Sequence, residues 1–269
     1  MDFCSKSSSE GGAVRPADRH EKIVKLVHKA GEVSVDDLAQ TLGASRETIR
    51  RDLANLDAMG RLKKFHGGAR VRSNTSVEPA VEGPFALRMA ENLPAKRKIA
   101  HAAASLLAPG DAVFIDTGTT TLILAEALVD LPALVVVTNS WRIAATLSAN
   151  PDHKVFLIGG AYGADAGESL GQFAVEQIRK FRARHAFLTV GAVDENAVMD
   201  FDAQVTEVAQ AMIERVDSVT VLADASKFGK RGIFEVAPWA RIDRLVTDDA
   251  PPRALAEALK GGGTQIVVA

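Results

Sequence analysis

The sequence predicts an α/β protein in two parts: a small, mainly helical N-terminal part and a larger part built on a mostly parallel sheet. Apolar residues recur at helical spacing in the first part, whereas short β-branched runs alternate with helical patterns in the second. Charge divides in the same way. Residues 19–72 carry 12 Lys/Arg and 7 Asp/Glu, a net charge of +5, although the whole chain has a net charge of −2. A basic first part on an acidic remainder indicates two parts with different partners.

Two helices are expected first. Apolar residues at helical spacing between Ile23 and Ala30 predict a helix over residues 19–30. Gly31 follows, where a helix often ends in a left-handed residue. Ser34 begins a capping box with an aspartate in the place more often held by glutamate. The second helix should therefore begin after Ser34, and a glycine eight residues after Val35 should end it.

The third helix carries the strongest signal in the chain. Ser45 is a good N-cap, and Ile49, Leu53 and Leu56 fall on one stripe that must be buried. A basic segment and a Gly-Gly turn at Gly67 follow it. Short helices, a tight turn, a third helix with a polar face and a basic hairpin are typical of a winged helix-turn-helix. The alternative is a small helical bundle whose arginines form only a solvated face.

A winged helix-turn-helix binds double-stranded DNA with its third helix and its wing. The helix offers cationic and hydrogen-bonding side chains to base edges, and the wing offers cations to phosphates. The candidate DNA-contacting residues are Ser45, Arg46, Thr48, Arg50, Arg51, Lys63, Lys64, His66 and Arg70.

Composition predicts the domain boundaries. Residues 1–17 are rich in Ser and Gly and are expected to be a disordered tail, followed by a DNA-binding domain over 18–72. Proline and glycine punctuate residues 73–94, which we interpret as a linker containing a short helix around 85–92. The second domain is expected over 95–269.

The chain has one cysteine, Cys4, so it forms no internal disulfide, and a reducing cytoplasm is the expected location. No apolar run approaches the roughly 20 residues needed to span a bilayer, and no signal peptide is evident. We therefore expect no membrane partner.

Seven short apolar runs predict the strands of the second domain. They are residues 112–115, 134–138, 155–158, 186–190, 219–222, 245–247 and 265–268. Helical patterns lie between several of them, at residues 121–128, 141–147, 173–181 and 207–216. This alternation predicts a largely parallel sheet covered on both faces. Ligands bind such sheets beyond the carboxyl ends of the strands.

One loop at a strand end has the composition of an anion site. Residues 116–121, Asp-Thr-Gly-Thr-Thr-Thr, follow a predicted strand and precede a predicted helix. Gly118 is expected to let the backbone fold tightly, so that amides and threonine hydroxyls converge on a phosphate at the helix N-terminus. The loop is not a nucleotide P-loop, because GxxxxGK[ST] is absent. The alternative is a capped strand-to-helix turn.

Other strand ends carry small, polar or charged groups that suit a phosphorylated, polyhydroxylated guest. Asp194 and Glu207 could accept hydrogen bonds from hydroxyls, and Lys227 could pair with a phosphate. Each residue also has a purely structural interpretation as a cap, a turn or a solvated side chain, which we favour for Glu207. The candidate effector-binding residues are Asp116, Gly118, Thr119, Thr120, Thr121, Asn139, Gly160, Asp194, Glu207 and Lys227.

Catalytic and metal motifs are absent from the sequence. The histidines do not cluster at metal-ligand spacing, and there is no G-x-S-x-G elbow. We therefore expect no metal, no cofactor and no catalytic residue.

The chain closely resembles the DeoR family of bacterial transcriptional regulators from Arg19 to Val268. The resemblance is carried by V-S-V-D-D-L-A, S-R-E-T-I-R-R-D-L, G-R-L-K-K-F-H-G-G-A, A-K-R-K-I-A, D-T-G-T-T-T, A-F-L-T-V-G-A-V-D, E-V-A-Q-A-M-I and A-D-A-S-K-F. It implies a sensor domain similar in fold to ribose-5-phosphate isomerase that usually senses phosphorylated sugars or sugar-pathway intermediates. It also implies ligand-holding roles for Asp116, Gly118, Thr119, Thr120, Asn139, Asp194, Glu207 and Lys227.

Two positions depart from the family pattern. Ala209 stands where the family commonly has a lysine after Glu-Val, and residues 196–200 lack a glycine often found near them.

The expected function is that of a DNA-binding repressor of carbohydrate genes. It should act as a homodimer or homotetramer on operator DNA, under the control of a phosphorylated sugar. The rival is a sugar-phosphate isomerase with an added DNA-binding domain, since Asp194, Glu207 and Lys227 could supply a base and an electrophile. The intact DNA-binding motif argues against it, because turnover would consume the signal.

Overall fold

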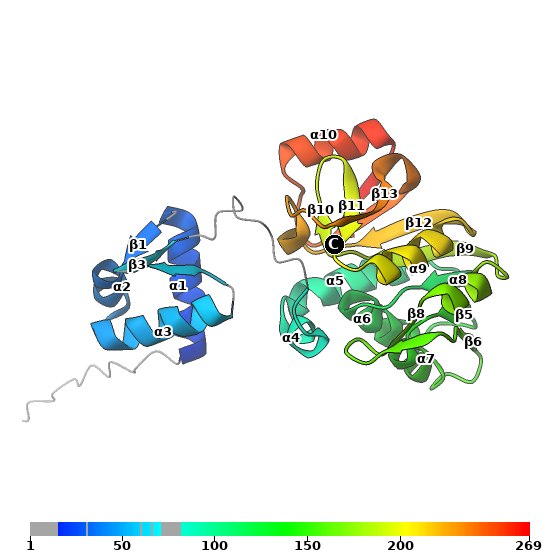
Figure 1. Cartoon of the computed structure of the whole chain (residues 1–269), viewed down its shortest axis with the longest axis horizontal. Coiled ribbons are helices and arrows are strands. Elements are labelled where there is room, and N and C mark those ends of the chain that lie inside the picture. The colour runs from blue at the N-terminus through cyan, green and yellow to red at the C-terminus, as the bar shows by residue number, and fades with distance from the viewer. Residues whose placement is uncertain (1–15, 31, 60, 66, 71–81) are drawn as a thin grey trace, which may run out of the picture. The chain divides into compact units, whose positions relative to one another are not determined.

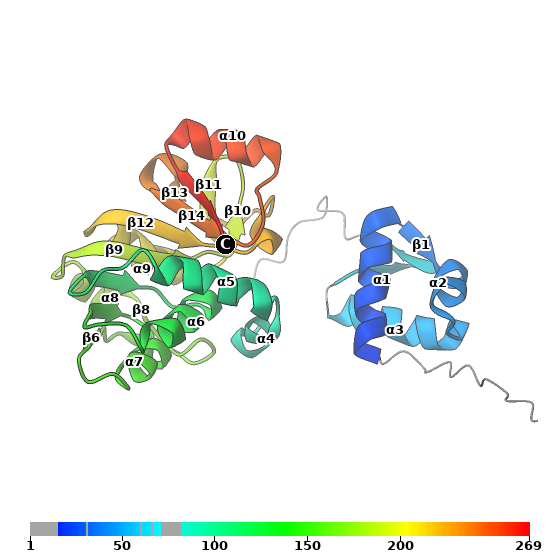
Figure 2. The same cartoon turned by 180° about the vertical axis from the view of Figure 1, so that it is seen from behind.

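The computed structural model of the chain divides into two compact units, residues 1–76 (the first unit) and 77–269 (the second unit). It describes residues 16–30, 32–59, 61–65, 67–70 and 82–269. The expectations for Gly31, for His66, for most of the tail and for the linker up to residue 81 lie outside the described residues. Figures 1 and 2 show the elements of both units from opposite sides.

The first unit consists of three helices and a three-stranded antiparallel sheet. The helices are α1 (Pro16–Ala30), α2 (Val35–Leu42) and α3 (Arg46–Ala58). The strands are β1 (Glu32–Ser34), β2 (Lys63–Phe65) and β3 (Gly68–Arg70), in the order β1-β3-β2. The three predicted helices and the wing hairpin are confirmed; the added strand β1 was not anticipated. The predicted stripe of Ile49, Leu53 and Leu56 is fully buried against α1 and α2 residues such as Ile23 and Leu38.

The predicted caps position these helices. The hydroxyl of Ser34 accepts a hydrogen bond from the Asp37 amide at 3.1 Å, and that of Ser45 accepts one from the Thr48 amide at 3.1 Å. Gly43 ends α2 with a left-handed φ of 60°. In the wing, a Cβ on Gly68 would lie 2.5 Å from the Val33 carbonyl oxygen. A larger residue at Gly68 would therefore push β1 away from β3.

An ion-pair cluster that the sequence analysis missed joins α1 to α3. The Arg19 guanidinium lies 2.5 Å and the His20 ring 2.9 Å from the Asp52 carboxylate, whose side chain is 7% exposed. Burial opposes the ionisation of Asp52, but hydrogen bonds from Arg19 and His20 outweigh it and lower its pKa. Because α3 is locked to α1 on its inner side, the orientation of its outer face is fixed.

The second unit is built on a seven-stranded parallel sheet with the order β15-β14-β12-β9-β4-β5-β6. The strands are β4 (Ala112–Ile115), β5 (Val135–Thr138), β6 (Lys154–Leu157), β9 (Ala183–Thr189), β12 (Val216–Leu222), β14 (Arg244–Thr247) and β15 (Gln265–Val268). All seven predicted strands are confirmed. Since the strands are parallel, their carboxyl ends share one edge, which we call the carboxyl edge.

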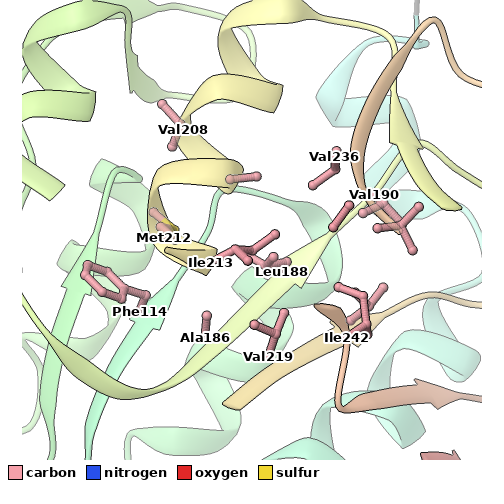
Figure 3. Close-up of a cluster of buried hydrophobic side chains, with 14 of the residues drawn as sticks. Phe114, Ala186, Leu188, Val190, Val208, Met212, Ile213, Val219, Val236 and Ile242 are labelled. Atoms are coloured by element: carbon pink, nitrogen blue, oxygen red, sulfur yellow. The ribbon is translucent and has the colours of Figure 1, made fainter. Parts of the chain in front are cut away.

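Helices cover both faces of this sheet, as the alternation predicts. Buried residues of α5 (Leu93–Ala104), α6 (Thr119–Leu128) and α7 (Trp141–Leu147) pack with Val113 and Ile115. Buried residues of α8 (Gln172–Ile178), α9 (Ala203–Ile213) and α10 (Arg253–Gly262) pack with Phe114 on the opposite side. Figure 3 shows Val208 and Met212 of α9 in this second core.

The short helix predicted around residues 85–92 is confirmed as α4 (Phe85–Ala90). Several other short elements of the second unit were not predicted. They are the hairpin of β7 (Ala161–Gly163) and β8 (Glu168–Leu170), the antiparallel sheet of β10 (Ala192–Val193), β11 (Ala197–Asp200) and β13 (Phe234–Pro238), and the 3₁₀ turns η1 (Ala225–Lys227) and η2 (Trp239–Arg241). The Ser169 amide donates to the Asn139 carbonyl at 2.8 Å, which places β8 beside the end of β5. No helix among the described residues is long and apolar enough to cross a membrane.

Candidate DNA-binding face and effector site

The outer face of α3 carries exposed arginines. Arg46 lies 2.6 Å from Asp36, and Arg51 lies 3.3 Å from Glu47. All four of these side chains are more than half exposed, and such surface pairs are worth little and exchange easily. Arg50 is exposed and has no acidic partner within the described part of the chain. These cations are therefore available to a polyanion.

Two other predicted contacts on α3 also belong to its cap. The hydroxyls of Ser45 and Thr48 hydrogen-bond each other at 2.8 Å, while Ser45 accepts from the Thr48 amide. Both residues lie at the helix N-terminus, where the dipole favours an anion. The cap orients these hydroxyls. A contact of either hydroxyl with DNA would therefore be made in addition to its hydrogen bonds within the helix.

The wing places like charges opposite one another. Lys63 of β2 and Arg70 of β3 are register partners, and both are exposed. Like charges directly opposite in an antiparallel pair are destabilising unless an anion neutralises them. The exposed Lys64 adds a third cation, and its amide donates to Asp57 at 3.2 Å, which ties the wing to the end of α3. His66 lies outside the described residues.

Asp116 follows β4 at the carboxyl edge and is 1% exposed. One carboxylate oxygen accepts from the Thr117 amide at 2.7 Å, and the other, Oδ2, is buried without a hydrogen-bond partner among the described residues. Burial, reinforced by the nearby Glu168 carboxylate, raises the pKa of Asp116 well above its usual value. A ligand hydroxyl is the kind of group that would satisfy this oxygen.

Asn139 links this loop to its neighbours. The Thr117 hydroxyl donates to the Asn139 side-chain oxygen at 3.0 Å, and the Asn139 amide group donates to the Ser169 carbonyl at 3.3 Å. Asn139 is 1% exposed. It therefore joins the ends of β4 and β5 to β8, whatever contact it makes with a guest.

The reason for the glycine at position 118 differs from our expectation. Its φ of 179° is extended backbone that any residue adopts, so the predicted tight turn is wrong. The glycine is needed for space, because a Cβ there would clash with the Thr189 hydroxyl and lie 2.9 Å from the Thr189 Cβ. The Thr189 hydroxyl in turn donates to the Thr117 carbonyl at 3.2 Å, which holds the loop against the end of β9.

Three buried threonines form the first turn of α6. Thr119, Thr120 and Thr121 are 6%, 5% and 0% exposed. Their amides open the helix and have no carbonyl of an earlier turn to bind. The Thr121 hydroxyl donates to the Gly118 carbonyl at 3.1 Å, so it serves the helix itself. The opening amides of α6 thus lie directly beside Asp116.

Three cations gather near the end of β12. Lys227 closes η1, and its Nζ lies 2.7 Å from Oε1 of Glu82; Nη1 of Arg88 lies 2.7 Å from Oε2 of the same carboxylate. Lys96 is 5% exposed and donates from its Nζ to the Arg88 carbonyl. Burial lowers the pKa of Lys96, and the charges of Lys227 and Arg88 add to this effect. The three side chains therefore form one basic group.

Carboxyl groups also gather near Asp116. Burial and the neighbouring aspartates Asp202, Asp200 and Asp165 raise the pKa of Glu168 to about 7, although Arg88 opposes them. Burial also raises the pKa of Asp200, whose Oδ2 accepts from the Gly191 amide at 3.2 Å. No group of three or more described His, Cys, Asp or Glu residues is arranged to hold a metal ion. The carboxyl edge thus brings cations and carboxyl groups close together.

Three predicted residues stand apart from this arrangement. Asp194 caps the turn between β10 and β11, accepting from the Asn196 and Ala197 amides at 2.8 and 3.1 Å. Glu207 is exposed on α9. A Cβ on Gly160 would lie 2.6 Å from the Leu170 carbonyl oxygen, so close packing accounts for this glycine. Their roles toward an effector stay predictions.

Sequence reasoning missed five residues of the site. Lys96 lies in the segment A-K-R-K-I-A. The positive charge of this segment could have indicated a basic residue of the site. Glu82 and Arg88 lay in the predicted linker, Arg88 within its predicted short helix, and no motif identified either residue as part of a site. Glu168 and Asp200 lie in short antiparallel elements that have no clear sequence signature.

Comparisons with known proteins identify both units. Residues 19–75 match the DeoR-like helix-turn-helix domain, and residues 91–249 match the DeoR C terminal sensor domain. The HTH-type transcriptional repressor CsqR of Escherichia coli K12 is 31% identical over 93% of this chain and 94% of its own length. The glycerol-3-phosphate regulon repressor of the same organism is 30% identical over 91% and 96%. A putative aga operon transcriptional repressor of Escherichia coli O157:H7 is 29% identical over 97% of each chain.

Solved structures match more weakly. Ribose 5-phosphate isomerase A of Methanocaldococcus jannaschii matches with a TM-score of 0.39 and 15% identity, over 52% of this chain and 56% of its own. The Pyrococcus horikoshii translation initiation factor eIF-2B matches with a TM-score of 0.40 and 15% identity, over 86% and 82%. Likeness at this level carries no argument about function.

Proposed function

The chain belongs to the DeoR family of transcriptional repressors, and we propose that a phosphorylated sugar bound at its carboxyl edge controls its binding to operator DNA. Among its relatives, one is named for a glycerol-3-phosphate regulon and another for the aga operon. We extend this to carbohydrate genes as the targets, and to the cytoplasm, where the DNA lies, as the location.

The observation that carries the proposal is that the carboxyl edge brings cations and buried carboxyl groups close together. Lys227, Arg88 and Lys96 supply the cations, and the opening amides of α6 add donors for an anion. Charge-assisted hydrogen bonds are roughly twice as strong as neutral ones, so a phosphate dianion would gain most there.

The carboxyl groups of this edge suit the hydroxyl groups of the same guest. Asp116 keeps one buried oxygen without a partner, and leaving such an acceptor unsatisfied costs about 1–3 kcal/mol. A hydroxyl donor removes that cost. Glu168 and Asp200 offer further acceptors nearby. A sugar phosphate has both the anion and the hydroxyls that these cations and carboxyl groups require.

We propose that the protein binds this sugar phosphate without converting it. An isomerase needs a base placed at the sugar carbonyl. Of the two acids that the sequence put forward, Asp194 uses one carboxylate oxygen on two turn amides, and Glu207 is exposed on α9. Neither has the surroundings of a general base.

On the DNA side, we propose that Arg50 and Arg51 contact bases and that Lys63, Lys64 and Arg70 contact phosphates. One winged unit buries too little surface for a tight and specific site, so we propose a symmetric homodimer or homotetramer. Two such units read half-sites whose spacing follows the helical turn of DNA.

The test combines ligand and DNA binding on the full chain. DNA fragments retained by the protein are selected from its genome, and calorimetry compares matched pairs of sugars and sugar phosphates. We expect a phosphorylated sugar to bind, its free sugar to bind at least tenfold more weakly, and bound ligand to change DNA affinity. Lys227→Ala should abolish the ligand response while DNA binding persists. Equal affinity for both members of every pair would contradict the phosphate proposal.

An enzyme assay addresses the rival. Aldose–ketose interconversion of pentose and hexose phosphates is measured at high protein concentration. Turnover at roughly 1 per second or faster, within the ordinary enzyme range, would contradict binding without conversion.

A further inference from the structure

We infer that Glu82 is an internal occupant of the effector's anion position, so that the phosphate of the effector must displace it from Lys227 and Arg88. This inference rests on the proposed function. It assigns to Glu82 a role that none of the family motifs in this chain includes. It also identifies a contact through which the effector site reaches the polypeptide leading to the first unit.

The geometry of Glu82 is that of a bound anion. One carboxylate oxygen lies 2.7 Å from the Lys227 ammonium, and the other lies 2.7 Å from the Arg88 guanidinium. The side chains of Glu82, Lys227 and Arg88 are 21%, 22% and 23% exposed, so all three are mostly withdrawn from water. Each oxygen thus has its own cation, as two oxygens of a phosphate would have.

Glu82 is held in the charged form. Burial opposes its ionisation, but Lys227 and Arg88 outweigh burial and keep its pKa below the usual value. At neutral pH the carboxylate therefore neutralises the cations that an effector phosphate would need. A phosphate dianion carries more charge and three acceptor oxygens, so it can replace the single carboxylate when its concentration is sufficient.

The position of Glu82 in the sequence also supports this inference. It is the first described residue of the second unit, and the residues before it lead in sequence to the first unit. The segment after Glu82 has separate anchors: the Phe85 amide donates to Asp165 at 2.9 Å, and Arg142 lies over the Phe85 ring at 5.3 Å. Loss of the Glu82 contacts would therefore release the start of the segment and leave α4 in place.

Competition of this kind links ligand binding to DNA binding. In one state the Glu82 carboxylate binds Lys227, and in the other state the effector phosphate binds Lys227. The two states differ in whether the chain is anchored through Glu82. A ligand that binds one state better shifts the population toward it, and the shift is limited by the difference in affinity. Glu82 would thus lower the affinity of the protein for the effector. Loss of the same contact would couple effector binding to DNA binding.

The test uses Glu82→Gln in the full chain, with Glu126→Gln as the matched control. Both changes remove one negative charge, but Glu126 is exposed on α6 and has no part in the anion position. Inorganic phosphate and D-glucose 6-phosphate are the probes, measured by calorimetry. We expect Glu82→Gln to bind inorganic phosphate about tenfold or more tightly than the wild type, because a charge-assisted competitor has been removed. Glu126→Gln should bind as the wild type does.

Lys227→Ala separates the possible failures. If Lys227→Ala loses phosphate binding while Glu82→Gln binds as the wild type does, Glu82 is not a competitor, and the inference is overturned although the proposed function stands. If Lys227→Ala binds phosphate normally, or if no variant binds either probe, the proposed anion position itself is wrong and the inference fails with it. Glu82→Asp, which keeps the charge on a shorter side chain, should stay closer to the wild type if charge is what competes. Thermal unfolding of each variant checks that the fold is intact.

DNA binding gives a second and independent readout. Without ligand, Glu82→Gln should bind the selected DNA fragments with an affinity shifted toward that of ligand-saturated wild type. If Glu82→Gln binds phosphate more tightly but its DNA affinity is unchanged, Glu82 competes with phosphate only. Its role in linking ligand binding to DNA binding would then be overturned.

Discussion

Glu168→Gln should change how the stability of the second unit depends on pH. Glu168 lies on β8 near Asp200, and its pKa is raised from 4.5 to about 7, chiefly by burial. In the unfolded chain the group ionises at its ordinary, lower pKa. Between these two values the folded state therefore binds more protons than the unfolded state, and stability falls as the pH rises.

The magnitude follows from the size of the shift. One pKa unit corresponds to 1.36 kcal/mol, so raising the pKa from 4.5 to about 7 costs the folded state at most about 3 kcal/mol at pH 8. A glutamine imitates the protonated acid at every pH and carries no such cost. For a domain of 150–250 residues, each kcal/mol moves the Tm by roughly 2–4 °C, so the variant should melt up to about 12 °C above the wild type at pH 8. Below pH 4.5 the two proteins should melt alike.

Differential scanning calorimetry of ligand-free protein from pH 4 to 8 measures this difference. Asp116 and Asp200 also have raised pKa values, so the wild type and the variant should both lose stability as the pH rises, but the variant should lose less. Glu126→Gln, on the exposed side of α6, should run parallel to the wild type. Two parallel curves for the wild type and Glu168→Gln would refute the electrostatic account of this site.

Four other changes test the remaining features. Arg50→Ala should weaken DNA binding by about 1–3 kcal/mol and relax sequence preference in gel-shift titrations. Lys63→Ala should weaken binding to all sequences alike and reduce the salt dependence of binding. Wild-type affinity in both variants would contradict the proposed DNA face. Gly118→Val should abolish sugar-phosphate binding in calorimetry, because its side chain would collide with Thr189, and unaltered affinity would show that the loop does not hold the ligand. Asp52→Asn should destabilise the first unit by on the order of 2 kcal/mol in thermal unfolding, because the partly buried Arg19 and His20 side chains lose their carboxylate partner, and an unchanged melting temperature would contradict the role of this cluster.

The sequence predicted what depends on local pattern. The stripe of Ile49, Leu53 and Leu56 found α3, and the Asp116 loop was visible because its strand, turn and helix are contiguous. Contacts between distant segments leave no such pattern. Glu82 and Lys227 are separated by 145 residues, and nothing in the composition of either segment identifies the other as its partner. Glu168 was hidden because β7 and β8 are too short to show a strand period.

The error at Gly118 shows why local reasoning needs the tertiary structure. We interpreted the glycine between a strand and a helix as required for its backbone conformation. Its φ of 179°, however, is a value that any residue can adopt. The restriction comes from Thr189 on the neighbouring strand β9, which fills the space where a side chain would project. The same loop is therefore fixed by packing from β9 and by the Thr117–Asn139 hydrogen bond from β5. A loop held from two strands is pre-organised for an anion, so little ordering has to accompany ligand binding. The conformational change that a sensor needs must then arise elsewhere at the carboxyl edge, and the replaceable carboxylate of Glu82 is the group whose contacts can be exchanged without disturbing that loop.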